Sequence, residues 1–315
     1  MKRSPFEYSN DNKRYHTLNY HNLIKYGQKI HKAVLDCGFT CPNIDGTKGR
    51  GGCIFCDGGS GYFTHGELDV MSQLKSEEKR IFSKYGDSAR FIAYFQANTN
   101  TYAPVSKLRE IYCSVLNDPS VCGISVGTRA DCLPDDVIGL LSDISRKTDL
   151  TVELGMQSCH EKTIDIINRC YTHDEFLKGF RKLKSNGIRT CIHVINGLPG
   201  EDAEMMIKTA AELAKLSPDA VKLQMLHVIK GTTLADMFQK RDIRLLERDE
   251  YIDIIVKQLE LLPPQTVIER ITGDGDKSKL LAPSWSADKI SVLGGIDKRL
   301  AELDTWQGKN YKKQV

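Results

Sequence analysis

Residues 41–56 read CPNIDGTKGRGGCIFC and place Cys41, Cys53 and Cys56 at the two ends of a glycine-rich loop. Glycines let a backbone turn closely and direct its N–H groups at an inorganic anion such as sulfide. Four thiolates would indicate a closed zinc site, and two would suit a redox pair. Three thiolates indicate a metal centre with one coordination position left open.

The composition as a whole is that of an ordinary globular protein. The 315 residues are enough for one α/β domain with an extension, and 40% hydrophobic with 27% charged residues excludes wholesale disorder. Nowhere do about 18 apolar residues run together, and the amino terminus lacks the apolar core of a signal peptide. We therefore expect a cytoplasmic protein without membrane contact, whose ten cysteines are not disulfide-bonded.

Positive charge gathers in residues 1–36, which carry seven Lys or Arg residues against three acids and so have a net charge of +4. Tyrosines and histidines are interleaved with these cations. This combination is typical of a surface that contacts phosphates and stacks on bases. A solvated leader segment has the same composition, so the charge alone leaves both interpretations open.

Short apolar runs alternate with helical patterns, which predicts a series of βα units around a parallel sheet. The expected strands are residues 31–36, 90–95, 121–126, 150–155, 188–195 and 220–226. The expected helices cover about 67–85, 105–117, 134–145, a broken pair within 160–186, 201–216 and 233–239. Polar clusters follow nearly every strand, and their convergence on one site favours an incomplete TIM-like (β/α)6 barrel over an open sheet.

The chain divides into three expected parts. Residues 1–30 form the basic amino-terminal segment, 31–241 the partial barrel and 242–315 a small C-terminal extension. The extension begins with a helix, breaks at Pro263-Pro264 and contains an expected strand at 267–272.

A series of motifs runs in a fixed order from about residue 26 to 285. It includes CGFTCPNIDGTKGRGGCIFC, YFQANTNTYA, SVGTRADCLP, ELGMQS, INRCYTHDEF, INGLPGE and KLQMLHVIKGT. Together these motifs closely resemble the radical S-adenosylmethionine (radical SAM) superfamily, and within it the YtqA/YhcC-like branch. That branch is related to the catalytic subunit of Elongator and to oxygen-independent coproporphyrinogen oxidase.

The resemblance implies a 4Fe-4S cluster on Cys41, Cys53 and Cys56, with Cys37 outside the ligand set. The open iron would bind S-adenosylmethionine, and the reduced cluster would cleave it to a 5′-deoxyadenosyl radical that abstracts a hydrogen atom from substrate. An electron donor such as flavodoxin or ferredoxin would supply the electron. The fold implied is the radical SAM partial barrel.

The resemblance also implies cofactor contacts. Gln157 and Arg169 match a Gln and an Arg that contact the cofactor in the coproporphyrinogen oxidase pattern. His193 stands where those relatives have an Asp, and Asn98 with Thr99 stands in the place of a Gly-Gly motif. The expected cofactor contacts are therefore Gln157, Arg169, His193, Glu153, Asn98, Thr99 and Phe55.

Several of these residues have a structural alternative. Glu153 could bond a ribose hydroxyl or could be an acid paired inside the barrel. Cys170 could donate a hydrogen atom to a substrate radical or could be a structural thiol. Lys230 could face the substrate or be an exposed lysine, and Arg129 with Asp131 could form an ion pair at a strand end.

The function implied is maturation of the C5 aminomethyl side chain of wobble 2-thiouridine in tRNA, such as conversion of carboxymethylaminomethyl to aminomethyl. The basic amino-terminal segment would suit a tRNA partner. One alternative keeps the radical chemistry but gives it a small metabolite. Another is a zinc knuckle formed by Cys37, Cys41, Cys53 and Cys56, which would bind RNA without redox chemistry.

Overall fold

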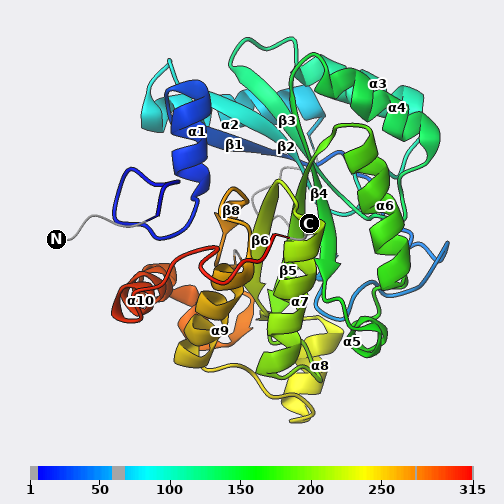
Figure 1. The fold of residues 1–315 in the computed structure, drawn as a ribbon. Helices are drawn as coiled ribbons and strands as arrows, with labels where there is room; N and C mark the ends of the chain where they lie inside the picture. Colours follow the sequence, from blue (N-terminus) through cyan, green and yellow to red (C-terminus); the bar gives the residue numbers. More distant parts are fainter. Residues whose placement is uncertain (1–5, 59–67, 274, 314–315) are drawn as a thin grey trace.

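The computed structural model describes residues 6–58, 68–273 and 275–313. Its centre is a parallel sheet of seven strands that curls into a half barrel (Figure 1), in the order β1-β2-β3-β4-β5-β6-β8. The strands are β1 (Ile30–Leu35), β2 (Arg90–Phe95), β3 (Val121–Thr128), β4 (Asp149–Gln157), β5 (Arg189–Asn196), β6 (Ala220–Met225) and β8 (Val267–Arg270). A separate two-stranded sheet pairs β7 (Val228–Ile229) with β9 (Leu280–Ala282).

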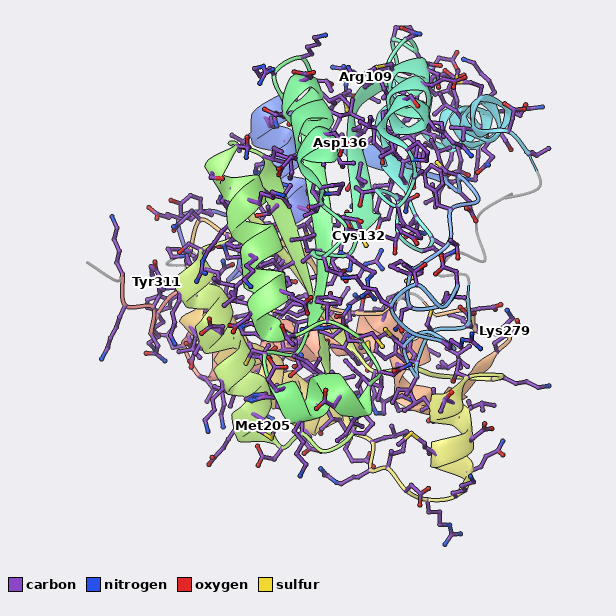
Figure 2. All side chains as sticks on the ribbon, turned by 90° about the vertical axis from the view of Figure 1, so that its right-hand side faces the viewer. Arg109, Cys132, Asp136, Met205, Lys279 and Tyr311 are labelled. Atoms are coloured by element: carbon purple, nitrogen blue, oxygen red, sulfur yellow. The ribbon has the colours of Figure 1, made fainter. Side chains whose placement is uncertain are left out.

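Helices cover the outer face of the half barrel. Figure 2 places Arg109 of α3 and Met205 of α7 at opposite ends of this layer. The helices are α1 (Leu18–Tyr26), α2 (Val70–Tyr85), α3 (Val105–Val115), α4 (Asp135–Ser145), α5 (Glu161–Ile166), α6 (His173–Ser185), α7 (Ala203–Leu216), α8 (Thr233–Gln239), α9 (Arg248–Leu261) and α10 (Lys289–Glu302), with a 3-10 turn η1 (Ser284–Ala287). None of the helices in the described part is both long and apolar enough to cross a membrane.

Strand β4 shows why the sheet has one dry and one polar face. Leu150, Val152, Leu154 and Met156 are at most 3% exposed and belong to the main hydrophobic core under the helices. Successive side chains of a strand point to opposite faces, so the residues between them line the inside of the half barrel. Those residues include Thr151 and Glu153. The outer face therefore stabilises the sheet, while the inner face carries polar groups.

The seventh strand comes from the C-terminal extension. The strand expected at 267–272 forms as β8 and pairs in parallel with β6, so it continues the barrel sheet. Among the described residues β1 and β8 are the sheet edges, with no ladder between them. Lys32 of β1 and Glu269 of β8 form an ion pair of 3.0 Å across this seam. The half barrel is thus closed on this side by side chains.

Helix α1 covers the amino ends of the strands. Its cap Thr17 forms a bridge to Ile268 of β8, and Lys25 and Tyr26 both bond Asp149, the first residue of β4. The preceding segment lies between α1 and α10 (Figure 1), where Lys13 pairs with Asp297. The basic amino-terminal segment is therefore part of the base of the barrel.

The six expected strands are all confirmed, with β2 at the expected bounds. The expected helices are confirmed too, the broken pair being α5 and α6, although the expected start at Glu67 lies outside the described residues.

Candidate active site at the carboxyl ends of the strands

The cysteine loop follows β1 and is held against the segment after α5. The Asn168 side chain donates to the Gly52 carbonyl (2.7 Å), and Asn43 donates to the Asn168 carbonyl (2.5 Å). Ile54 N donates to the Ile167 carbonyl at 3.1 Å. Gly51 and Gly52 have φ of 80° and 74°, which only glycine adopts without strain, so the loop can turn back at Cys53.

The three expected cluster cysteines are partly buried, and Cys53 lies close enough to Cys56 and Cys41 for their charges to act on it. Burial, and next the neighbouring Cys56, raise the pKa of Cys53 to about 12, while the Arg129 guanidinium acts in the opposite direction. Burial also raises the pKa of Cys56. The shifts at Cys53 and Cys56 favour their protonated thiols without metal, and binding iron would release these protons.

Cys37 has a different environment. It packs against the main hydrophobic core, and burial followed by Asp36 raises its pKa to about 12. Within residues 6–58, 68–273 and 275–313, no group of three or more His, Cys, Asp or Glu side chains is arranged to hold a metal ion. The four cysteines of the zinc-knuckle alternative thus do not converge on one ion. A four-iron cluster sets a different requirement, because its thiolates surround one cubane and each binds a different iron.

The loop's own contacts fit such a cluster. The Asn43 amide nitrogen lies 3.7 Å from the Cys53 sulfur, while the fully buried Asn43 Oδ1 has no partner. A Cβ added to Gly49 would lie 2.2 Å from that oxygen and 2.7 Å from the Cys170 sulfur, so glycine is needed there. Cys41, Cys53 and Cys56 are the residues that would hold the cluster.

Asn98 and Thr99 brace the start of the cysteine loop. The Asn98 side chain donates to the Phe39 carbonyl at 3.0 Å, and Thr99 N donates to the Thr40 carbonyl. Asn98 has φ of 56°, a left-handed value that is uncommon outside glycine and recurs at functional sites. These two residues link the end of β2 to the loop.

Gln157 and Arg169 lie at the end of β4 and after α5. The Gln157 amide nitrogen donates to the Gly155 carbonyl (2.8 Å), and a Cβ on Gly155 would lie 2.3 Å from the other end of the same amide group. The buried Arg169 guanidinium donates to the carbonyls of Tyr171 and Ser158, and its Nη2 has no partner. Both residues thus fix local backbone and could still meet a ligand.

Arg129 and Asp131 form the expected strand-end ion pair, with two contacts of 2.9 Å. The pair also anchors the site. Arg129 donates to the Arg169 carbonyl at 2.9 Å, and Asp131 binds Lys48 of the cysteine loop at 2.6 Å. Strand β3 is thereby connected to both the cysteine loop and the Arg169 segment.

Glu153 is the centre of a buried polar layer inside the half barrel, with a fully buried side chain. Its Oε1 accepts from Ser125 (2.6 Å) and Lys32 (3.0 Å). Its Oε2 accepts from Tyr94 and His193, both at 2.8 Å, and from Lys222. Glu153 thus takes the arrangement of a paired acid inside the barrel.

The remaining candidates are divided between the site and its surroundings. The Cys170 sulfur lies 3.2 Å from Asn168 Oδ1, at the segment that holds the cysteine loop. Phe55 packs against a small second core with Ile54 and Ile167. Lys230 is exposed beyond β7, so the structure does not bring it into this cluster.

Sequence reasoning missed most of the polar layer. Lys32, Tyr94, Ser125 and Lys222 each interrupt an apolar run within a strand. Their alternation with apolar neighbours is the signal that could have placed them on the inner face.

Comparisons with known proteins agree with this geometry. A model of the Radical SAM superfamily matches residues 44–213, and a model of the Radical_SAM C-terminal domain matches residues 218–302. The chain is 45% identical over 315 residues to the uncharacterized protein YtqA of Bacillus subtilis (strain 168), covering 99% of this chain and 98% of that protein. It is 32% identical over 279 residues to protein YhcC of Escherichia coli (strain K12), covering 88% and 89%.

More distant matches involve tRNA enzymes and their fold. A tRNA uridine(34) acetyltransferase of Methanocaldococcus jannaschii is 31% identical over 126 residues, which is 39% of this chain and 23% of that protein. The structure of Elp3 from Methanocaldococcus infernus superposes with a TM-score of 0.66 and 16% identity, covering 89% of this chain and 65% of that one. The family models and the long relatives show that this chain belongs to the radical SAM superfamily, whose enzymes use a 4Fe-4S cluster and S-adenosylmethionine.

Proposed function

We propose that this radical SAM enzyme acts on tRNA, in the maturation of the C5 side chain of the wobble uridine. The observation that carries the proposal is the 31% identity over 126 residues with a tRNA uridine(34) acetyltransferase. The reaction proposed is conversion of the carboxymethylaminomethyl side chain toward aminomethyl. The enzyme would work in the cytoplasm with an electron donor such as flavodoxin or ferredoxin.

The proposed division of labour follows the geometry of the site. Cys41, Cys53 and Cys56 hold the cluster. When bound, the cluster and S-adenosylmethionine would supply one-electron chemistry that removes a hydrogen atom from substrate. The proposed cofactor contacts are Gln157, Arg169, His193, Asn98, Thr99 and Phe55, whereas the fully buried Glu153 belongs to the polar layer beneath them. Cys170 would act toward substrate, and the exposed Lys230 would contact only parts of a substrate that extend beyond β7. The half barrel shields the reaction from water once substrate covers its mouth.

The amino-terminal charges lend this proposal less support than their number suggests. Lys13 pairs with Asp297, Arg14 with Asp304 and Lys25 with Asp149. All three pairs belong to the base of the barrel, whereas the cysteine loop lies at the carboxyl ends of the strands. A tRNA would therefore meet other cations at the mouth.

Mass spectrometry of tRNA nucleosides tests the substrate. Cells that lack the gene should accumulate carboxymethylaminomethyl-uridine at the expense of aminomethyl forms. Wild-type protein should restore the profile, and Cys41→Ala should not. An unchanged profile would contradict the tRNA substrate and favour a small metabolite. Colourless protein that holds one zinc after anaerobic purification would instead support the RNA-binding alternative.

A further inference from the structure

A continuous chain of ionisable side chains crosses the interior of the half barrel. His193 Nε2 lies 2.8 Å from Glu153 Oε2, Lys32 lies 3.0 Å from Glu153 Oε1, and Lys32 lies 3.0 Å from Glu269. These four residues come from β5, β4, β1 and β8. The chain therefore links distant strands through side chains alone.

The His193 end of this row of ionisable side chains lies just below the candidate active site. His193 is level with Gly155 of β4, two residues before Gln157. Its side chain keeps 22% exposure, and its Nδ1 has no hydrogen-bond partner among the residues that the structure describes. His193 thus offers one ring nitrogen to the space beneath the strand ends.

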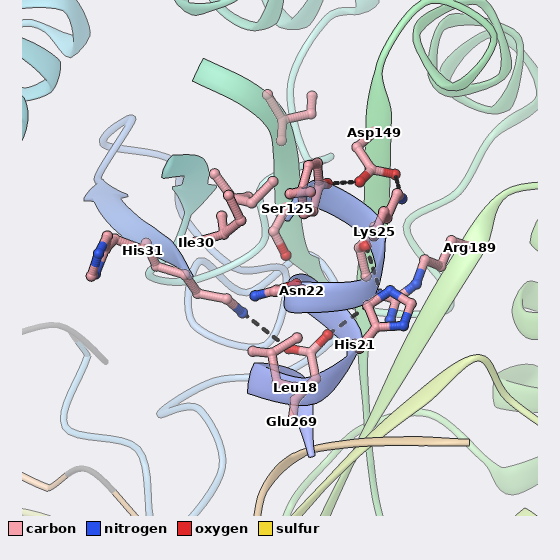
Figure 3. Close-up of a pocket in the computed structure, with 15 residues that line it drawn as sticks. Leu18, His21, Asn22, Lys25, Ile30, His31, Ser125, Asp149, Arg189 and Glu269 are labelled. Carbon is pink, nitrogen blue, oxygen red and sulfur yellow. Dashed lines mark hydrogen bonds and ion pairs between the residues drawn. The ribbon is translucent and has the colours of Figure 1, made fainter. Parts of the chain in front are cut away.

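The other end of this row, Lys32 and Glu269, lines a cavity at the base of the barrel. Figure 3 shows this cavity between α1 and the amino ends of the strands, with Glu269 and Arg189 side by side. Its volume is about 50 Å³, which is room for roughly three waters. Lys25 lies on its lining with a side chain 39% exposed, so the lining reaches the protein surface there.

The donors around Glu153 determine the protonation of His193. Burial opposes ionisation of Glu153, but Lys222 and Lys32 hold its pKa well below the usual range. An ionised carboxylate only accepts hydrogen bonds, so His193 Nε2 must carry the proton and Nδ1 must be bare. Burial and then Lys222 lower the pKa of His193, against the opposing effect of Glu153, and this favours the neutral ring. The other titratable or charged groups that act on this pair are Tyr94, Cys191, Glu269 and Arg270.

We propose that His193 is an acid–base group of the reaction and that Glu153, Lys32 and Glu269 carry its proton to the cavity at the base. The inference rests on the proposed radical chemistry. Loss of a hydrogen atom makes neighbouring protons of a substrate more acidic, and a site that excludes water at its mouth needs another exit for them. The polar layer supplies that exit.

The transfer balances without an oxidant. The substrate bond to hydrogen breaks with its electron pair left on the substrate, and the proton joins His193 Nδ1. Nε2 passes its proton to Glu153. Lys32 gives one proton to Glu269 and takes one from Glu153, and Glu269 releases its proton to cavity water. Glu153, Lys32 and Glu269 are positioning and relay residues, because His193 alone faces the ligand space.

The ring nitrogens of His193 give a test that needs no substrate. Nitrogen-15 NMR of the anaerobically purified, cluster-containing protein, assigned with His193→Gln, should show protonated Nε2 and bare Nδ1 at neutral pH. A proton on Nδ1, or a charged ring, would overturn the inference. This measurement uses wild-type protein, so it stands even if Glu153→Gln fails to fold.

Two matched variants test the exit. Glu269→Gln should slow conversion of tRNA from the deletion strain at least tenfold and raise its solvent deuterium isotope effect, because general acid–base steps contribute about 10²-fold or more. Asp149→Asn lines the same cavity outside the relay, and it should change both values less than twofold. Equal effects of the two variants would overturn the relay. If wild-type protein leaves the tRNA unaltered, the tRNA substrate fails, while a proton on His193 Nδ1 would still overturn the inference.

Discussion

The two ends of the half barrel are built on different principles. At the carboxyl end, the backbone takes left-handed φ values at Asn98, Gln157 and Cys170. One nitrogen of the buried Arg169 guanidinium there has no hydrogen-bond partner among the described residues. At the amino end, α1 and the preceding segment are joined to the barrel by ion pairs with Asp149, Asp297 and Asp304. Strain tends to persist where a ligand uses it. We therefore expect substrate and cofactor to react at the mouth, whereas the base stabilises the fold and holds the cavity of the proposed proton exit.

The largest expected effect is at the cysteine loop. Cys41→Ala, Cys53→Ala and Cys56→Ala should each abolish the iron–sulfur absorbance after anaerobic reconstitution, because a site of three thiolates has no spare ligand. Cys37→Ala is the matched control, since that thiol packs against the hydrophobic core, and it should keep the cluster. Loss of the cluster in Cys37→Ala would remove the distinction between the two cysteine environments.

The next effect concerns the polar layer between the two ends. Glu153→Leu should lower the free energy of unfolding by about 3–5 kcal/mol, because the buried Lys222 would lose its ion-pair partner, while Lys32 would keep only Glu269. Urea unfolding measures this. Glu78→Leu, which removes a surface pair with Lys75, should cost less than about 1 kcal/mol. Similar losses of unfolding free energy in both variants would mean that the buried polar layer stabilises the fold no more than a surface ion pair does.

The same layer predicts a pH dependence. Burial alone would raise the pKa of Glu269, but Lys32, Lys222 and Arg189 bring it down to about 2. A lowered folded pKa contributes stability that is present above the unfolded pKa of about 4.3 and is lost as pH falls toward 2. Glu269→Gln should therefore flatten the fall of thermal stability between those values. An unchanged slope would contradict the ion pairing of Glu269.

A smaller effect is expected at the mouth. Gln157→Ala should retain iron and weaken S-adenosylmethionine binding about tenfold, since a hydrogen bond to a charged group contributes roughly 1.5 kcal/mol. Equilibrium binding to the reconstituted protein measures this. Gln239→Ala at the end of α8 is the matched control. Equal affinity in both variants would rule out Gln157 as a cofactor contact.

The smallest effect belongs to the base. Replacing Lys13, Arg14 and Lys25 together by Met should leave tRNA affinity and its salt dependence nearly unchanged, because these cations already pair with aspartates. Partly exposed pairs contribute about 0–1 kcal/mol each, so stability should fall only modestly. A flatter salt dependence of tRNA binding would show that the base contacts phosphates and would erase the contrast between the two ends.

The sequence predicts what depends on local patterns. The bounds of β2 and α8 follow from short apolar runs and turn residues, and the motif of three cysteines marks the mouth. The place of β8 in the barrel sheet and the contact between Lys32 and Glu269 could not be predicted. Those residues are 237 positions apart, and only the curvature of the sheet brings them together.

The contacts between the amino-terminal and carboxyl-terminal segments have a consequence for folding during translation. Arg14 meets Asp304 at a separation of 290 residues, and Gln307 bonds His16 and Arg14. During translation the first segment must wait for almost the last one, and closing so long a loop carries an entropic cost that grows with the logarithm of its length. The ribosome adds about 5–20 residues per second. The base of the barrel therefore remains incomplete for many seconds after the cysteine loop has left the ribosome.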